Sequence, residues 1–322
     1  MGCGKSEAEA AFSAGVKKME EFTHYVREMG LKTLEDLTKN PNQKVVVVFG
    51  RTYNAFAREA NMGIPAKFAS RGVAVIPWDA LPADHEPSDE NMCWANGQLL
   101  LRAASFVKKH PQLYGCFITN FSCGPDSFLV GYFRDIMKTK PSLTLELDSH
   151  TADAGVNTRI EAFLDIVDRY RQLGTKDEAQ EPFTPAQIVF EKGRPVFVTS
   201  RNERIDLYDK RVHVLFPSMG DLSSQVIAAA MSGAGIRATC LPPYDFDVLK
   251  MGRAHSSCKE CLPLQLTMGG LLSYLKKRTD EKEYLVYFMP TTAGNCRFTQ
   301  YSVFMRNLIE KQRIRNVALL SL

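Results

Sequence analysis

Short apolar runs alternate with longer helix-like patterns along most of this chain. The first run, KVVVVFG at residues 44–50, is continuously apolar and ends in glycine, which is typical of a strand buried on both faces of a parallel sheet. Similar runs follow at 72–78, 114–121 and 143–148. The helices expected in this half lie at 64–70, 97–110, 124–140 and 157–173. Such alternation predicts a doubly wound α/β lobe with a mainly parallel sheet.

A second alternation begins after a polar, proline-bearing stretch. Its expected strands lie at 194–200, 211–220, 236–242, 283–290 and 317–322, and its expected helices at 221–235, 262–278 and 301–312. We therefore predict an N-terminal helical leader (1–40), a first α/β lobe (41–175), a linker (176–187) and a second α/β lobe (188–322). Because the second lobe ends on a strand that no helix covers, we expect it to be incomplete.

Composition narrows the class of protein. The chain has 322 residues, of which 45% are hydrophobic and 24% charged, so it can form globular cores. Its net charge of +4 comes from scattered basic residues, which argues against nucleic acid as a partner. No apolar run approaches the roughly 20 residues that span a bilayer, and the N-terminus lacks a signal-peptide core. We expect a cytoplasmic protein that does not partner a membrane.

Five of the eight cysteines lie in loop-like sequence just before a helix-like pattern. They are Cys93, Cys123, Cys258, Cys261 and Cys296. Ligands of open α/β sheets bind beyond the carboxyl ends of the strands, and helix N-termini there favour anions. We therefore expect these thiols to face one cleft between the two lobes. Widely spaced cysteines are compatible with an iron–sulfur cluster.

Other interpretations of the cysteines stay open. The C-x-x-C pair of Cys258 and Cys261 also suits zinc or a redox disulfide, although structural zinc usually takes two close pairs and only one is present. Cys116 and Cys240 lie in or beside apolar strand patterns and are expected to be structural. Cys3, in a polar leader, has no evident role. No catalytic residue can be assigned.

Four segments together resemble a known family. NMCWANGQLLLRAASFV, FITNFSCGPDSF, KECLPLQLTMGGLL and GNCRFTQY occur in the order found in the cluster-binding part of the 2-hydroxyacyl-CoA dehydratase and CoA-enzyme activase superfamily. The resemblance covers roughly residues 10–322 and is nearest to the long activase-fused branch. No ATPase motif is present, so this would be the dehydratase-like part alone.

The resemblance implies a low-potential cluster, either a [4Fe-4S] cluster or a double cubane, between two flavodoxin-like lobes. The implied ligands are Cys93, Cys123, Cys261 and Cys296, with Cys258 in reserve, because the family motif centres on the cysteine that precedes Leu262-Pro263. The dehydratases use three cysteines per subunit. A fourth thiolate from Cys296 would therefore be a departure that suits electron storage or relay.

The implied function is reduction of a small substrate or CoA thioester with electrons from an ATP-dependent activase, and a homodimer is also compatible with it. One alternative is an electron-transfer or cluster-carrying module without its own substrate. Another is a zinc-binding structural protein.

Overall fold

The computed structural model describes residues 2, 4–88, 91–174, 183–220, 222–280 and 282–321. The chain divides into two compact units. Unit 1 comprises Met1–Ser88 and Trp94–Asp177, and unit 2 comprises Asp89–Cys93 and Glu178–Leu322. Cys3 and much of the linker expected at 176–187 lie outside the described residues. Among the described helices, none has both the length and the apolarity needed to span a membrane.

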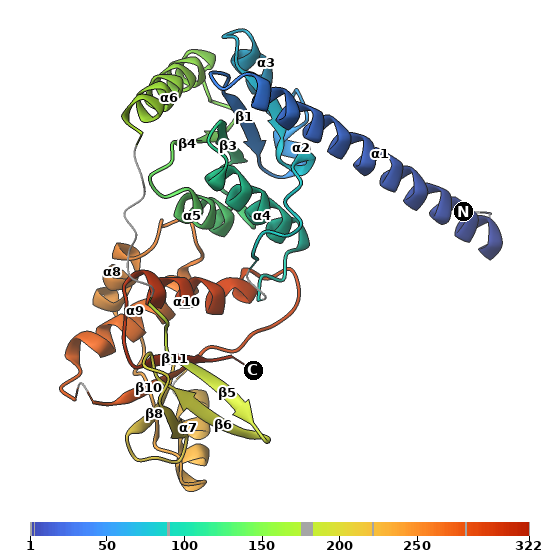
Figure 1. The fold of residues 1–322 in the computed structure, drawn as a ribbon. Coiled ribbons are helices and arrows are strands. Elements are labelled where there is room, and N and C mark those ends of the chain that lie inside the picture. The colour runs from blue at the N-terminus through green and yellow to red at the C-terminus, as the bar shows by residue number, and fades with distance from the viewer. Residues whose placement is uncertain are drawn as a thin grey trace. The chain divides into compact units, whose positions relative to one another are not determined.

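Unit 1 contains a parallel sheet whose strands follow the order β2-β1-β3-β4; β1, β3 and β4 are labelled in Figure 1. The strands are β1 (Val45–Phe49), β2 (Ala74–Pro77), β3 (Leu113–Asn120) and β4 (Ser142–Leu147). In the central strand β1, Val46 pairs with Val75 on one side and Tyr114 on the other. Every residue of β1 is buried, because helices cover both faces of the sheet.

The helices of unit 1 are α1 (Lys5–Lys39), α2 (Thr52–Ala55), α3 (Ile64–Ala69), α4 (Ala95–Lys109), α5 (Asp126–Met137) and α6 (Asp153–Leu173), with a 3-10 turn η1 (Trp78–Ala80). Helices α3 and α6 pack on one face of the sheet through residues such as Phe68 and Phe163. On the other face, the ring of Phe133 in α5 lies 5.0 Å from that of Phe49 and 5.4 Å from that of Phe117. The sheet is therefore doubly wound, as predicted.

Helix α1 joins unit 1 through its carboxyl-terminal part. A methyl group added at Gly30 would lie 2.0 Å from the carbonyl oxygen of Ala80, so glycine allows the helix to touch η1. Leu37 is buried, whereas Phe12 and Met19 are 74% and 66% exposed. The amino-terminal half of α1 thus projects from the rest of unit 1 (Figure 1).

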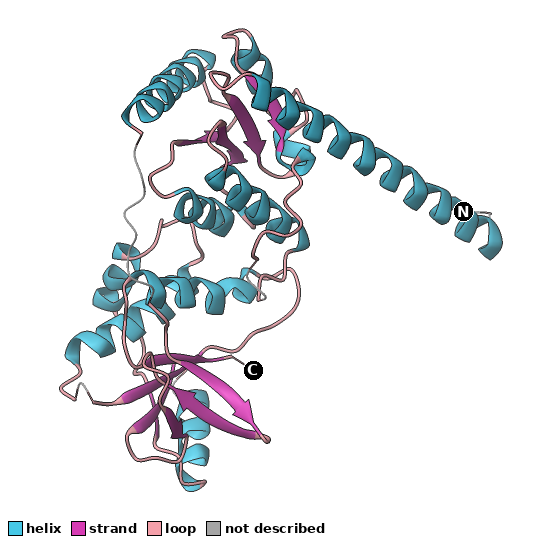
Figure 2. Cartoon of the chain, in the orientation of Figure 1, coloured by secondary structure: helices cyan, strands magenta, loops and turns pink. Residues whose placement is uncertain are grey.

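Unit 2 contains a second parallel sheet, shown in magenta in Figure 2, with the order β11-β10-β8-β9. Its strands are β8 (Val212–Phe216), β9 (Ala238–Cys240), β10 (Tyr284–Phe288) and β11 (Val317–Leu320). Numbered within each unit, both parallel sheets follow the order 2-1-3-4, which is the flavodoxin-like arrangement with four strands. The predicted pair of similar α/β lobes with mainly parallel sheets is confirmed.

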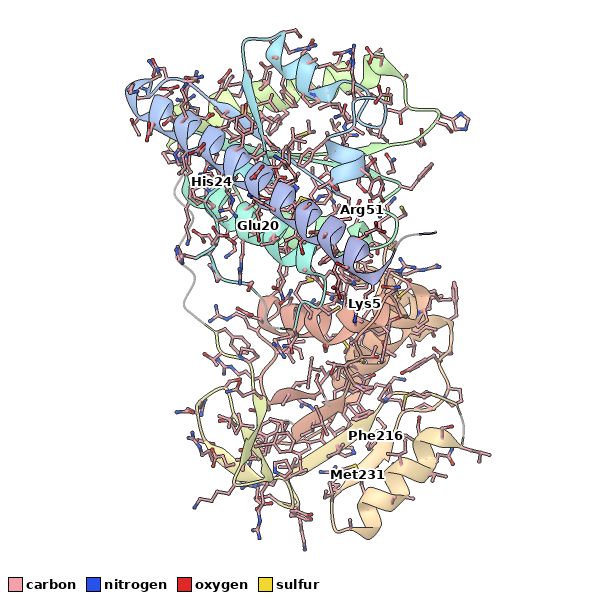
Figure 3. All side chains as sticks on the ribbon, turned by 90° about the vertical axis from the view of Figure 1, so that its right-hand side faces the viewer. Lys5, Glu20, His24, Arg51, Phe216 and Met231 are labelled. Carbon is pink, nitrogen blue, oxygen red and sulfur yellow. The ribbon has the colours of Figure 1, made fainter. Side chains whose placement is uncertain are left out.

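The helices of unit 2 are α7 (Ser223–Gly233), α8 (Phe246–Ala254), α9 (Leu262–Lys277) and α10 (Tyr301–Lys311), with a 3-10 turn η2 (Arg297–Gln300). Phe216 and Met231, labelled in Figure 3, belong to the core between the sheet and α7. On the opposite face, the hydroxyl of Tyr287 donates to the carbonyl of Thr267 in α9 at 2.8 Å. Helices therefore cover this sheet on both faces as well.

The alternation predicted that the stretch 194–200 is a strand of the second parallel sheet, and this prediction is wrong. The stretch contributes to a separate antiparallel sheet formed by β5 (Gln187–Glu191), β6 (Arg194–Val198) and β7 (Arg204–Asp206). The physical reason is the two-residue turn of Lys192 and Gly193, whose φ angles of 51° and 78° are those of a tight β-hairpin.

Helix α8 was also missed, since the region before Cys258 was expected to be a long loop. Asp245 caps the helix by accepting from the backbone N–H of Val248 at 2.8 Å. Helices α8 and α9 touch through glycines: a methyl group at Gly269 would lie 2.1 Å from the carbonyl oxygen of Val248. This close crossing fixes both ends of the loop that carries Cys258 and Cys261.

Candidate functional site

In unit 1, the connections that follow β1 and β3 run toward opposite edges of the sheet, so the carboxyl ends of these two strands form a topological switch point. Ligands of open α/β sheets bind at such switch points. Arg51 follows β1 after Gly50, and Cys123 follows β3 in the loop before α5.

The Arg51 guanidinium connects these two loops. Its Nη2 donates to the carbonyl oxygen of Cys123 at 3.2 Å and to the Sγ atom at 3.3 Å. Its Nε lies 3.2 Å from Oδ1 of the fully buried Asp126, whose Oδ2 accepts from the hydroxyl of Thr119 at 2.6 Å. Cys123 thus has a fixed cation beside its sulfur.

Burial raises the pKa of Asp126, while the hydrogen bond from Thr119 and the charge of Arg51 counteract that rise. A buried carboxylate is costly unless a charge or hydrogen bonds compensate it. Asp126 therefore anchors Arg51, and Arg51 in turn orients the Cys123 loop.

In unit 2, the equivalent switch point lies between β8 and β10. Cys296 is in the loop after β10 and caps the turn η2, with its carbonyl accepting from the N–H of Thr299 at 3.2 Å. Cys261 is the N-cap residue of α9, with Pro263 in the first turn. The short segment that ends at Cys93 belongs to this unit too.

Three cysteines of unit 2 lie around two consecutive residues, Gln300 and Tyr301. The Sγ of Cys261 lies 2.7 Å from the hydroxyl of Tyr301. The amide Nε2 of Gln300 donates to the Sγ of Cys93 at 3.5 Å. Cys296 is four residues before Gln300, and its charge acts on Tyr301. Sequence-distant thiols from 93 and 261 are therefore brought to the turn that begins at Cys296.

The pKa of the Tyr301 phenol is raised well above its usual value. Burial is the largest cause, followed by the hydrogen bond and the charge of Cys261. The phenol consequently keeps its proton at neutral pH. The backbone N–H of Leu264, in the first turn of α9, donates to the carbonyl of Cys261 at 3.0 Å. In the contact between the phenol and the Cys261 thiol, either group can be the donor while both carry a hydrogen.

Cys258 has a different environment from Cys261, although the two are only three residues apart. Its φ angle is 62°, its side chain is exposed, and its thiol donates to the carbonyl of Arg253 at 3.8 Å. Glu260 holds the loop by accepting from the N–H of Ser257 at 3.1 Å. The two thiols of the C-x-x-C pair thus have different partners.

The remaining described cysteines are structural in character. Cys116 is fully buried in β3, and burial raises the pKa of its thiol to about 12. Cys240 is half-buried at the end of β9 and packs against the core of unit 2. All seven described cysteines are free thiols.

Sequence reasoning did not identify Arg51, Asp126, Gln300 or Tyr301. Gln300 and Tyr301 are the last two residues of the segment GNCRFTQY, which the sequence analysis did single out. The signal that could have identified them is their polar character next to Cys296 at the start of an apolar helix pattern. His255, close in sequence to the cysteine pair, contacts Gln312 at 2.6 Å.

Within the described residues, no three side chains of His, Cys, Asp or Glu lie where they could share one metal ion. The chemistry of the donor set still fits a larger thiolate-bound group. Each cysteine of a four-iron cluster binds a different iron atom, so its ligands are further apart than those of a single ion. Whether Cys93, Cys123, Cys261 and Cys296 act as ligands stays a prediction.

Comparison with known proteins gives one family match. Residues 1–81 match the family described as CoA enzyme activase uncharacterised domain (DUF2229), a span that runs from α1 through β2 to η1. Neither the curated proteins nor the solved structures contain a match. The match supports a relation to the CoA-enzyme activase and dehydratase superfamily.

Proposed function

We propose that this chain is a cytoplasmic iron–sulfur protein whose cluster is bound by Cys93, Cys123, Cys261 and Cys296. The observation that carries the proposal is the arrangement around Gln300 and Tyr301. Free thiols from separate parts of the chain lie there, two of them within hydrogen-bond distance of a polar side chain. Cys123 of unit 1 enters the proposal from the sequence, and Arg51 gives it a similar hydrogen-bond partner.

The surroundings of these thiols favour a negatively charged group. Cys261 begins α9, whose N-terminus carries a partial positive charge, and Cys123 has a guanidinium beside its sulfur. A cluster ligated by four thiolates is anionic. When bound, it would supply one-electron chemistry at low potential.

The family match over residues 1–81 supports an activase as the electron donor. In this proposal an ATP-dependent activase delivers single electrons to the chain, which uses them to reduce a small substrate or a CoA thioester. Four thiolates leave no iron open to substrate. An electron relay without its own substrate is therefore the second candidate, favoured by the place of Cys296 beside Tyr301.

The test is anaerobic purification of the protein with quantitation of iron, sulfide and zinc. We expect iron and sulfide in equal amounts and an electron paramagnetic resonance signal after reduction. Single serine replacements of Cys93, Cys123, Cys261 and Cys296 should each lower the iron content several-fold. Cys116→Ser is the control, because that thiol is buried in β3 and should not affect iron.

Two results would contradict the proposal. Full retention of iron in Cys261→Ser or Cys123→Ser would remove that residue from the ligand set. Zinc without sulfide in the wild-type protein would instead identify the structural zinc alternative.

A further inference from the structure

Gln300 and Tyr301 are consecutive, buried and polar, and each approaches the sulfur of a different cysteine. We propose that these two side chains are hydrogen-bond donors to the cluster ligands Cys93 and Cys261, and that they raise the reduction potential of the cluster. This inference rests on the proposed function and assigns roles to residues that are not ligands themselves.

The direction of the Tyr301 hydrogen bond follows from the proposed role of Cys261 as a ligand. A cysteine that binds a cluster is a thiolate and has no hydrogen, whereas the phenol has one hydrogen to donate. The 2.7 Å contact with Cys261 is therefore best satisfied by an O–H donated to a thiolate. A hydrogen bond to a charged acceptor is short and about twice as strong as one between neutral groups.

Gln300 has a similar geometry with a weaker contact. Its side chain is completely buried, its Nε2 donates to Cys93 at 3.5 Å, and its Oε1 has no hydrogen-bond partner among the described residues. Burying an amide with one half unpaired is costly. Among the described residues, the hydrogen bond to Cys93 is the interaction that offsets this cost. We therefore infer that the contact is functional.

The junction of η2 and α10 explains why two neighbours can serve two thiols. Gln300 ends the 3-10 turn and Tyr301 begins the helix, so their side chains leave the backbone in different directions. Asn91, two residues before Cys93, faces the guanidinium of Arg306 in α10, and its oxygen accepts at 2.7 Å when the amide is oriented toward it. Helix α10 thus holds the Cys93 segment at a second point.

Donors to cluster sulfur stabilise the reduced state, because reduction adds negative charge to the sulfur ligands. Removing a donor should therefore make the cluster harder to reduce. We expect Tyr301→Phe to keep its iron and to shift the reduction potential to a more negative value. Gln300→Glu, which places a carboxylate oxygen near Cys93, should shift it in the same direction.

The experiment uses the full chain, loaded anaerobically with iron and sulfide, and measures iron content and the midpoint of a redox titration followed by electron paramagnetic resonance. Tyr287→Phe is the matched control. It also removes one buried hydroxyl of unit 2, but that hydroxyl donates to the backbone carbonyl of Thr267 and not to a cysteine. Its midpoint should equal that of the wild type.

The outcomes separate the two proposals. If wild-type protein and Tyr301→Phe hold equal iron and titrate at the same potential, the role of Tyr301 is refuted and the cluster proposal stands. If Tyr287→Phe shifts as far as Tyr301→Phe, the effect is general loosening of unit 2 and the inference is wrong. If the wild type binds no iron, the proposed function fails and the inference fails with it.

Discussion

At the scale of single residues, Arg51, which is labelled in Figure 3, is the counter-charge of the fully buried carboxylate of Asp126. Replacing it by methionine keeps much of the side-chain volume but leaves Asp126 without its cation. Breaking a buried ion pair in this way costs about 3–5 kcal/mol. We expect Arg51→Met to lower the free energy of unfolding of unit 1 by that amount. Urea denaturation followed by tryptophan fluorescence measures it, since Trp78 and Trp94 both belong to unit 1.

The matched variant is the double replacement Arg51→Met with Asp126→Asn, which removes both charges and should recover most of the loss. Burial raises the pKa of Asp126, so acidification should also stabilise Arg51→Met relative to wild type as that carboxyl takes up a proton. Equal unfolding midpoints for wild type and Arg51→Met at neutral pH would show that the ion pair carries no stability.

The sequence predicted the site only in part, and the reason lies in the distance along the chain between partners. Loop position made Cys93, Cys123, Cys261 and Cys296 candidates because glycine, proline and polar neighbours mark strand ends, and their role as ligands stays a prediction. Their partners were not predictable in the same way. Arg51 is 72 residues from Cys123, and Tyr301 is 40 residues from Cys261. Only the packed sheet and helices bring such pairs together.

At the scale of elements, prediction succeeded where periodicity was strong. The run KVVVVFG became β1 because its side chains meet helices on both faces. Prediction failed at β5 and β7 because short strands with mixed burial leave little periodic signal. It also failed at α8, a nine-residue helix that begins after two prolines and the capping residue Asp245.

The contact between α8 and α9 leads to a prediction for the loop that carries Cys261. In Gly269→Ala the new methyl group would meet the carbonyl oxygen of Val248 at 2.1 Å and the backbone nitrogen of Gly252 at 2.9 Å. The helices must separate, and such overpacking typically costs about 1–3 kcal/mol. Thermal or urea unfolding followed by circular dichroism should show this loss in unit 2.

Gly131→Ala is the control for that experiment. Gly131 lies inside α5, and an added methyl group would meet nothing within 4 Å. Alanine is favoured over glycine in a helix by roughly 0.5–1 kcal/mol, so this variant should be as stable as wild type or more so. If Gly269→Ala behaves like Gly131→Ala, α8 and α9 are not in the close contact described.

At the scale of the whole molecule, the two units have separate cores, which makes unit-specific stability measurable. Both tryptophans belong to unit 1, so fluorescence reports that unit, and a change in circular dichroism without a fluorescence change reports unit 2.

Unit 2 also contains a buried polar network. His213 contacts Glu283 at 2.8 Å through Nδ1 and Thr239 at 2.7 Å through Nε2, and Arg237 donates to Glu283 at 3.0 Å.

That network predicts how the stability of unit 2 depends on pH. The pKa of His213 lies below its usual 6.5, mainly because the side chain is buried. The charge of Arg237 also lowers this pKa, whereas Glu283 raises it. The folded state therefore binds fewer protons than the unfolded state below pH 6.5, so stability is complete above that pH and falls as the pH drops. Between pH 7.5 and 5.5 the stability lost through this site is at most about 1.4 kcal/mol, the free energy that corresponds to one pKa unit.

We expect the urea transition that is seen by circular dichroism but not by fluorescence to move to lower urea over this range. His213→Gln should be less stable at pH 7.5 and should lose less on acidification. If the variant and the wild type lose the same free energy between the two pH values, His213 is not the group that titrates.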